Sequence, residues 1–265
     1  MTIDILICSL NKGIVRLGDV LLPKQDGLHY VVSYQYTDER YLDLIPEVLK
    51  TREDVSLYTT QGQGLSANRN SAMEKATADL VLFADDDARF TDETIPTIRK
   101  TFEENPDLDV AFFQCSTYTG KPLKPYPAHS MKITALPESY TISTIEMVAK
   151  RESLQNKIRF DERFGLGTKF LTCGEEDIWM VDALRLGLKM EYFPLKIVET
   201  STLLKRSLLF VDPGVQRSKG AFLYYTQGWK AWWTIFKFAF KSTRQGYCHF
   251  FPMLRHLAEG IRYMR

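Results

Sequence analysis

Three consecutive aspartates close a short apolar segment of this sequence. Leu80–Ala84 leads directly into Asp85, Asp86 and Asp87. In open α/β sheets ligands bind beyond the carboxyl ends of strands, and period-two alternation would point Asp85 and Asp87 the same way. Two carboxylates on one side suit Mg²⁺ or Mn²⁺, with other positions open to water or phosphate. The alternative is an Asp-rich turn that caps a helix beginning at Thr91, but three adjacent acids repel one another unless a cation is near.

A glycine-spaced stretch precedes this strand. It reads Gly-Gln-Gly-Leu-Ser-Ala-Asn-Arg-Asn from Gly62 to Asn70 and enters a helix. A helix N-terminus with an arginine in its first turn, here Arg69, can hold a phosphate or pyrophosphate. The stretch comes one strand before the aspartates, and this position strengthens its interpretation as a phosphate site.

A second acidic cluster, Gly174-Glu175-Glu176-Asp177, begins another helix. The helix dipole favours ionised carboxylates there, so the cluster can be a capping device. Equally, a carboxylate held ionised in a cleft can act as a general base. The residues alone leave both readings open.

The elements that must position these residues alternate along the chain. We expect strands at Ile3–Leu10, Tyr30–Tyr34, Val55–Thr59, Leu80–Ala84, Asp109–Thr117, Thr141–Ala149 and Met190–Val198, and helices at Tyr41–Lys50, Ser66–Ala76, Thr91–Glu104 and Glu175–Leu186. This order predicts an α/β fold with a doubly wound, Rossmann-like, mostly parallel sheet and helices on both faces. Residues 120–140 hold four prolines and predict an irregular loop region of the kind that often carries specificity.

Composition narrows the classes of protein. The 265 residues carry a net charge of +1, which excludes a globally basic nucleic-acid binder. The four cysteines have no C-x-x-C spacing and are expected to be free thiols of a reducing compartment. The N-terminus reads as a first strand rather than a signal peptide, so we expect a cytoplasmic protein.

The last fifty residues differ from the rest. Residues 216–265 contain nine basic residues and one acid, and large apolar side chains recur at helical spacing through 220–244. One reading is a core-packing helix; the other is an amphipathic helix lying on an anionic membrane surface through residues 220–265, with aromatics at headgroup depth. The sequence favours the second. It has no apolar run of about 18 residues, so we expect no spanning helix.

The order of the motifs resembles the family 2 glycosyltransferases of the GT-A fold, of the bacterial cell-surface polysaccharide type. The resemblance covers about residues 1–225. It rests on the first strand, Gly62–Asn70, the Asp-x-Asp motif at Asp85–Asp87, Phe160-Asp-Glu-Arg-Phe-Gly165 and the Gly-Glu-Asp-like motif at Gly174–Asp177. It implies a nucleotide-sugar site that requires Mn²⁺ or Mg²⁺.

The resemblance also implies roles for individual residues. Asp87 coordinates the metal together with Asp85, which lies near the ribose, and Asp177 is the catalytic base with Glu176 binding the acceptor beside it. The other donor-binding positions are Ser9, Asn11, Asp38, Arg69, Asp86, Arg217 and Lys219, of which Arg217 and Lys219 match a flexible basic segment that closes on the diphosphate.

Two positions depart from the family pattern. The second strand usually ends in Asp-Asp-x-Ser, whereas Ser33–Asp38 offers only Asp38 as a substitute. Many members supply a metal-binding His after the late strand, whereas Ile197–Ser201 contains none.

The predicted function is transfer of a sugar, with inversion, from a nucleotide-diphosphate donor, expected to be a UDP-sugar, to a hydroxyl of a glycan or lipid-linked glycan. The reaction is placed at the inner face of the cytoplasmic membrane. The alternatives are a sugar-phosphate nucleotidyltransferase and a non-catalytic membrane scaffold. We expect residues 1–215 to form the catalytic domain, with a nucleotide-sugar-binding half to about 115 and an acceptor-binding half at 116–215, and residues 216–265 to form a helical tail.

Overall fold

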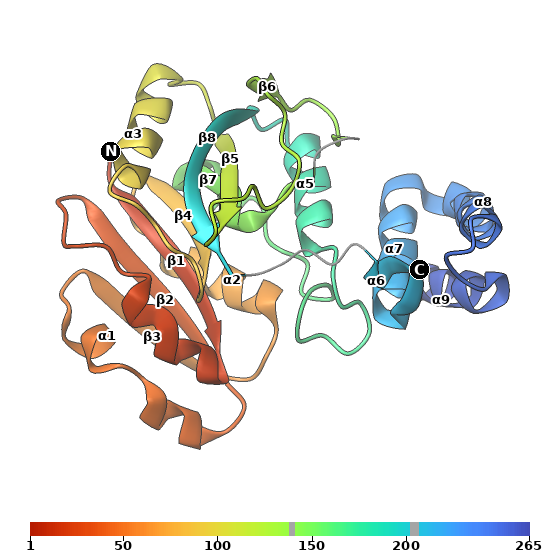
Figure 1. Ribbon diagram of the computed structural model, residues 1–265, viewed down its shortest axis with the longest axis horizontal. Coiled ribbons are helices and arrows are strands. Elements are labelled where there is room, and N and C mark those ends of the chain that lie inside the picture. Colours follow the sequence, from red (N-terminus) through yellow and green to blue (C-terminus); the bar gives the residue numbers. More distant parts are fainter. Residues whose placement is uncertain (138–140, 202–206) are drawn as a thin grey trace. The chain divides into compact units, whose positions relative to one another are not determined.

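The computed structural model describes residues 1–137, 141–201 and 207–265. Within them one eight-stranded sheet has the order β3-β2-β1-β4-β7-β5-β8-β6 (Figure 1). Its strands are β1 Ile3–Leu10, β2 Leu28–Tyr36, β3 Val55–Gln61, β4 Leu80–Asp85, β5 Val110–Thr117, β6 Met131–Lys132, β7 Met147–Lys150 and β8 Met190–Thr200. Pairing is parallel except where β7 meets β4 and β5 and where β6 meets β8. The predicted mostly parallel α/β sheet is confirmed.

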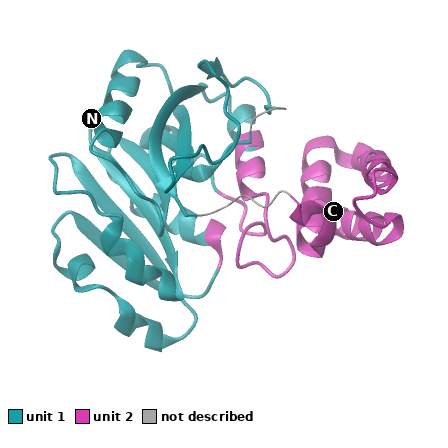
Figure 2. Cartoon of the chain, viewed as in Figure 1, with its two compact units in different colours: residues 1–63, 67–159, 182–204 teal, residues 64–66, 160–181, 205–265 magenta. Residues whose placement is uncertain are grey.

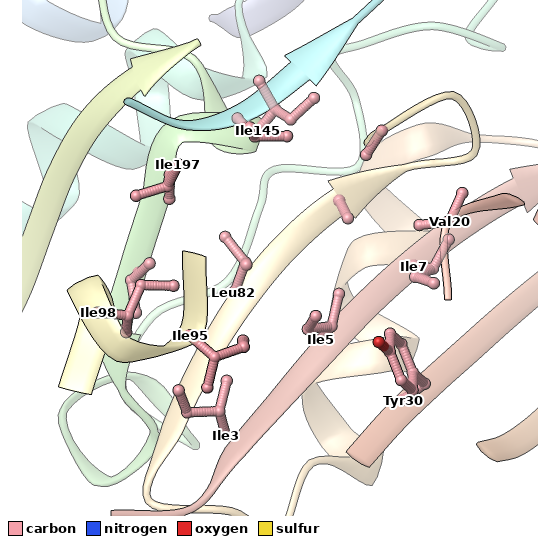
Figure 3. Close-up of a cluster of buried hydrophobic side chains, with 14 of the residues drawn as sticks. Ile3, Ile5, Ile7, Val20, Tyr30, Leu82, Ile95, Ile98, Ile145 and Ile197 are labelled. Carbon is pink, nitrogen blue, oxygen red and sulfur yellow. The ribbon is translucent and has the colours of Figure 1, made fainter. Parts of the chain in front are cut away.

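The central strands are apolar on both faces because the sheet is covered on both sides. In β1, Ile5, Leu6 and Ile7 are all fully buried. Ile5 and Ile7 point into the cluster of Figure 3, together with Leu82 of β4. The four cysteines, all in the described part of the chain, are free thiols, as the sequence predicts.

Helices connect the strands and continue along the chain after β8. They are α1 Glu47–Thr51, α2 Leu65–Lys75, α3 Thr94–Glu104, α4 Arg151–Leu154, α5 Glu175–Arg185, α6 Leu208–Val211, α7 Pro213–Gln227, α8 Ala231–Arg244 and α9 Phe250–Met264, with 3-10 turns η1 Asn11–Asp19, η2 Glu39–Leu44, η3 Thr144–Glu146 and η4 Gly228–Lys230. Ile95 and Ile98 of α3 pack on the cluster of Figure 3.

Three expected elements differ in the structure. The helix predicted over Tyr41–Lys50 is divided into η2 and α1 because Pro46 forces Ile45 into an extended conformation. The strand predicted over Thr141–Ala149 is confined to β7, which the 3-10 turn η3 precedes. The single helix predicted over 220–244 is wrong: α7 stops at Gly228, whose φ of +58° a glycine adopts without strain, and α8 starts after η4.

The chain divides into two compact units (Figure 2). Unit 1 comprises residues 1–63, 67–159 and 182–204 and contains the sheet. Unit 2 comprises residues 64–66, 160–181 and 205–265 and contains α7, α8 and α9.

The helices of unit 2 pack closely around two glycines. A Cβ added to Gly220 of α7 would lie 2.0 Å from the Leu257 carbonyl oxygen of α9, and one added to Gly260 would lie 1.9 Å from that of Arg217. Helix α9 lies within residues 216–265, where the sequence predicts a helical tail, but its limits were not predicted. In the part of the chain that the structure describes, no helix is both long and apolar enough to cross a membrane.

Candidate active site

The acidic triplet lies at the carboxyl edge of the sheet in unit 1. Asp85 is the last residue of β4 and pairs in register with Cys8 of β1. The chain runs from β1 to β2 on one side, whereas β4 lies on the other, so β1 and β4 flank a topological switch point. Ligands bind at such points in open α/β sheets. The expected position of the triplet is therefore found.

Arg69 lies beside the first aspartate. Its Nη2 atom is 3.9 Å from Asp85 Oδ1, and the Arg69 side chain is 6% exposed against 38% for Asp85. Arg69 belongs to α2, which begins directly after the two glycines, Gly62 and Gly64, both with positive φ. The structure thus brings the arginine and the acidic triplet together, as the sequence suggested.

Asp86 turns toward the segment after β1. Ser9 Oγ donates a hydrogen bond of 3.0 Å to Asp86 Oδ2, and Arg16 of η1 forms an ion pair with Oδ1. Burial raises the pKa of Asp86, and Arg16 opposes that shift. The sequence analysis did not identify Arg16, although its position after the first parallel strand was a usable signal.

Asp87 is not placed by strand alternation, because β4 ends at Asp85 and a turn follows. Asp87 is 8% exposed, and its carboxylate faces the end of β8. Thr200 Oγ1 lies 3.1 Å from both carboxylate oxygens, and the Ser201 amide donates at 3.2 Å, with its hydroxyl donating as well. Ile197–Ser201, the segment in which many family members have a metal-binding His, instead provides the hydroxyls of Thr200 and Ser201 as hydrogen-bond donors to Asp87.

Proteins hold Mg²⁺ or Mn²⁺ either entirely with their own side chains or with a few carboxylates together with phosphate and water. The residues around the triplet fit the second kind of site. Among the described residues, no group of three or more His, Cys, Asp or Glu side chains is gathered as an all-protein metal site. Mg²⁺ is more often bound by one or two carboxylates and completed by phosphates and water. Asp85, beside Arg69, and Asp87, beside the hydroxyl of Thr200 and the amide of Ser201, match that second arrangement.

Tyr118 is a further neighbour that the sequence analysis missed. It follows the last residue of β5, and its hydroxyl donates to the Asp87 carbonyl oxygen at 2.5 Å. The Arg89 guanidinium lies 3.9 Å from the Tyr118 ring centroid. Position after a parallel strand was again the signal that could have identified it.

The two remaining donor-binding candidates near β1 and β2 hold local structure. Asn11, with φ of +50°, accepts a 2.8 Å bond from the Thr37 amide through Oδ1. Asp38 caps η2 and pairs with Arg40 at 2.7 Å. That hydrogen-bonded pairing lowers the pKa of Asp38 to about 2.

A comparison with protein families decides among the functions considered from the sequence. The profile of "Glycosyl transferase family 2" matches residues 36–170, just over half of the chain. The chain belongs to glycosyl transferase family 2. It is therefore an enzyme that transfers a sugar from a nucleotide-sugar donor. Among curated proteins, none matches the sequence significantly.

Solved structures agree on the fold. TarS 1-349 of S. aureus superposes with a TM-score of 0.61 at 15% identity, covering 100% of this chain and 92% of that chain. TarS 1-349 in complex with UDP-GlcNAc gives 0.59 at 15% identity, with 99% and 92% covered. The complex with UDP gives 0.56 at 19%, with 84% and 66% covered. The fold of this glycosyltransferase is GT-A.

The second acidic cluster occupies the first turn of α5, as expected. Glu175, Glu176 and Asp177 open the helix. Asp177 is exposed, but the protein atoms around its carboxylate partly desolvate it, and this desolvation raises its pKa. The charge of Glu176 raises the pKa further, and Lys219 of α7 lowers it. A carboxylate with a raised pKa is a better proton acceptor at neutral pH than an ordinary aspartate.

Arg217 and Lys219 lie in a regular helix rather than in the expected flexible segment. Asp212 caps α7 by accepting from the Val215 amide at 2.9 Å, and Pro213 opens the helix. Arg217 donates to the Phe170 carbonyl at 3.2 Å and lies 3.6 Å from a Glu259 carboxylate oxygen. Good local capping and these contacts fix the segment as helix.

Proposed function

We propose that this glycosyltransferase is metal-dependent and inverting, and that its donor is a UDP-sugar. The observation that carries the proposal is the arrangement of Asp85, Asp87 and Arg69 at the switch point of the sheet. The TarS structures that hold UDP and UDP-GlcNAc support the choice of uridine. Asp85 and Asp87 would hold Mn²⁺ or Mg²⁺.

The chemistry is a single displacement. The acceptor hydroxyl oxygen forms a bond to the anomeric carbon while the bond from that carbon to the diphosphate oxygen breaks, so the configuration inverts. Asp177 takes the hydroxyl proton as general base, and Glu176 binds the acceptor beside it. When bound, a divalent cation stabilises the negative charge of the leaving diphosphate.

Other residues bind the donor in this proposal. Arg69 adds positive charge near the diphosphate, while Ser9, Asn11 and Asp38 lie around the base and ribose. Asp86 supports this group through Ser9 and Arg16. Arg217 and Lys219 remain candidates for phosphate contact, from an ordered helix. We keep residues 1–115 as the nucleotide-sugar half, 116–215 as the acceptor half and 216–265 as the tail.

The proposed acceptor is a glycan or lipid-linked glycan of cell-surface polysaccharide synthesis, reached from the inner face of the cytoplasmic membrane. Support comes from the aromatic residues of η4 and α8. Trp229 is 77%, Trp233 60% and Phe240 58% exposed. Exposed aromatics among lysines are typical of helices that lie at the boundary between lipid and water.

The test is nucleotide binding by thermal shift, with UDP, GDP, dTDP and CMP each measured with and without Mn²⁺. A ligand at a hundredfold excess over its Kd stabilises the fold by about 2.7 kcal/mol. We expect UDP with Mn²⁺ to give the largest shift. Asp87→Asn, which removes the charge but keeps the shape, should abolish the metal-dependent part.

Asp107→Ala is the matched control, because this exposed aspartate precedes β5 at the opposite edge of the sheet. It should bind UDP as the wild type does. Unchanged UDP affinity in Mn²⁺ for Asp87→Asn would remove the metal assignment, and a larger shift with another nucleotide would replace the donor.

A further inference from the structure

Side chains of α8 and α9 line an open, apolar groove in unit 2. Its volume is about 470 Å³, which lies within the range of about 300–1,000 Å³ typical of small-molecule sites. Ile235 of α8 and Leu254 and Ala258 of α9 line it and also belong to the core of the three C-terminal helices. The groove therefore reaches down to that core.

Two arginines on one face of α9 complete the lining. Arg255 and Arg262 both border the groove and are seven residues, or two helical turns, apart. Arg255 is 76% exposed beside its pair with Glu259, and the Arg262 guanidinium lies 5.9 Å from the Trp232 ring centroid. A guanidinium presents paired donors that match a phosphate.

A chain of aromatic contacts connects this groove with the exposed surface. Trp233 stacks on Phe236, Phe236 meets Phe250 edge to face, and Phe250 meets Phe251 in the same way. Phe236 and Phe251 line the groove, and Lys237 lies 5.0 Å from the Trp233 ring centroid. Aromatic rings with cations beside them, next to an apolar groove, suit the boundary between lipid headgroups and acyl chains. The cations can contact the headgroups, and the apolar surface can contact the acyl chains.

We propose that this groove binds one anionic membrane phospholipid, with an acyl chain on Ile235, Leu254 and Ala258 and the phosphate on Arg255 and Arg262. This deepens the proposed membrane contact and rests on it. Charge complementarity selects the occupant, because residues 216–265 hold nine basic residues and one acid. A flat interfacial helix would need no groove that reaches the core.

The first experiment counts bound lipids by native mass spectrometry on the full chain. It offers phosphatidylglycerol and phosphatidylcholine with identical chains, from detergent. We expect one phosphatidylglycerol per chain and at least a tenfold preference over phosphatidylcholine. The double variant Arg255→Gln/Arg262→Gln should reduce this preference to less than twofold.

The matched control is Lys241→Gln/Arg244→Gln, which removes two exposed charges from α8 that do not line the groove. It should weaken sedimentation with vesicles of phosphatidylglycerol but keep the single bound lipid. Equal retention of both lipids by the wild type would contradict the proposal that the groove binds the anionic headgroup. Loss of the preference in this control would contradict it as well.

The second experiment fills the groove with Ala258→Phe. We expect at least a tenfold loss of bound phosphatidylglycerol, with sedimentation on anionic vesicles retained because the exposed aromatics and cations are unchanged. If this variant does not fold, the arginine pair decides alone. Undiminished bound phosphatidylglycerol in a folded Ala258→Phe variant would overturn the proposal.

Failure of the groove is distinguishable from failure of the proposed function. If the wild type ignores anionic vesicles and binds no lipid, the membrane contact itself is wrong. If the wild type sediments with those vesicles but holds no lipid that the groove variants reduce, only the lipid-binding groove is wrong. Sugar transfer to a water-soluble acceptor is independent of both outcomes.

Discussion

Gly13 shows how little space the acidic triplet leaves for its neighbours. A Cβ at Gly13 would lie 1.8 Å from Asp86 Oδ2 and 2.8 Å from Ser9 Oγ. Gly13→Ala must therefore displace Asp86 and disturb the aspartates on both sides of it. Because the Asp86 carboxylate must move away from its position beside Ser9, we expect UDP affinity to fall about tenfold, or about 1.4 kcal/mol, by calorimetry.

Gly18→Ala is the control for that variant. It lies in the same element, η1, but its added Cβ would meet Val48 Cγ1 at an ordinary 3.7 Å. Its UDP affinity should match the wild type. Equal losses in both variants would mean that the fold of η1, rather than the space beside Asp86, determines donor binding.

Asp177 allows the proposed base to be tested by rate and stability together. Asp177→Asn should lower turnover by a factor of about 100 or more, the usual contribution of a positioned base. Because the folded-state pKa of Asp177 is raised, the fold favours the protonated form, and stability from this group is lost as pH rises through that pKa. At neutral pH the neutral variant should melt at the same temperature or higher.

The pH profile and neighbouring variants check the assignment. Wild-type turnover should fall with decreasing pH at a value above that of an ordinary aspartate, because the pKa of Asp177 is raised. Glu175→Gln and Glu176→Gln should cost less turnover or act through the acceptor KM. An inactive Glu175→Gln beside an active Asp177→Asn would show that the base is misplaced.

At the scale of elements, a buried ion pair attaches the proline-rich region to the sheet. Lys124 Nζ lies 2.8 Å from Glu146 Oε2 in η3, and the two side chains are 1% and 0% exposed. Tyr126 donates to the same carboxylate at 2.5 Å. Removing one member of such a pair leaves a buried charge uncompensated.

Lys124→Met should therefore lower the free energy of unfolding by about 3–5 kcal/mol, measured in urea. The double variant Lys124→Met/Glu146→Leu should recover most of that loss because no charge remains unpaired. Lys132→Met, an exposed lysine in β6, should stay near the wild type. A double variant as unstable as Lys124→Met would contradict the charge explanation.

At the scale of the whole molecule, the charge of the C-terminal region predicts membrane binding. Lys230, Lys237, Lys241 and Arg244 should each contribute about 1 kcal/mol on an anionic surface. The protein should sediment with anionic vesicles, weakly with neutral ones, and less as salt rises. Changing all four to Gln should release it while donor hydrolysis continues, since Asp85, Asp86 and Asp87 lie in unit 1 and none of the four cations is a proposed donor-binding or catalytic residue.

Trp232→Ala and Trp233→Ala are the corresponding aromatic variants. The residues are 37% and 60% exposed, so both variants should fold and lose vesicle binding. A wild type that ignores anionic vesicles would contradict the membrane prediction. Unfolding of both variants would show that these aromatics are core residues.

Local patterns were sufficient to predict the sheet and the position of the acidic triplet. The limits of β1 match the expected Ile3–Leu10, because a strand buried on both faces is a continuous apolar run. The carboxyl edge follows from strand order in a parallel sheet, so Asp85 and Arg69 were expected near one another. Helix limits failed where backbone chemistry intervened, at Pro46 and Gly228.

Only the tertiary structure decided which groups surround the aspartates. Arg16 lies 70 residues before Asp86, and Thr200 lies 113 residues after Asp87. Because β4 ends at Asp85, the direction of Asp87 depends on a turn and on those distant hydroxyls rather than on strand alternation. Periodicity reports which residues share a face within one element, whereas contacts between elements depend on packing that a short stretch of sequence does not encode.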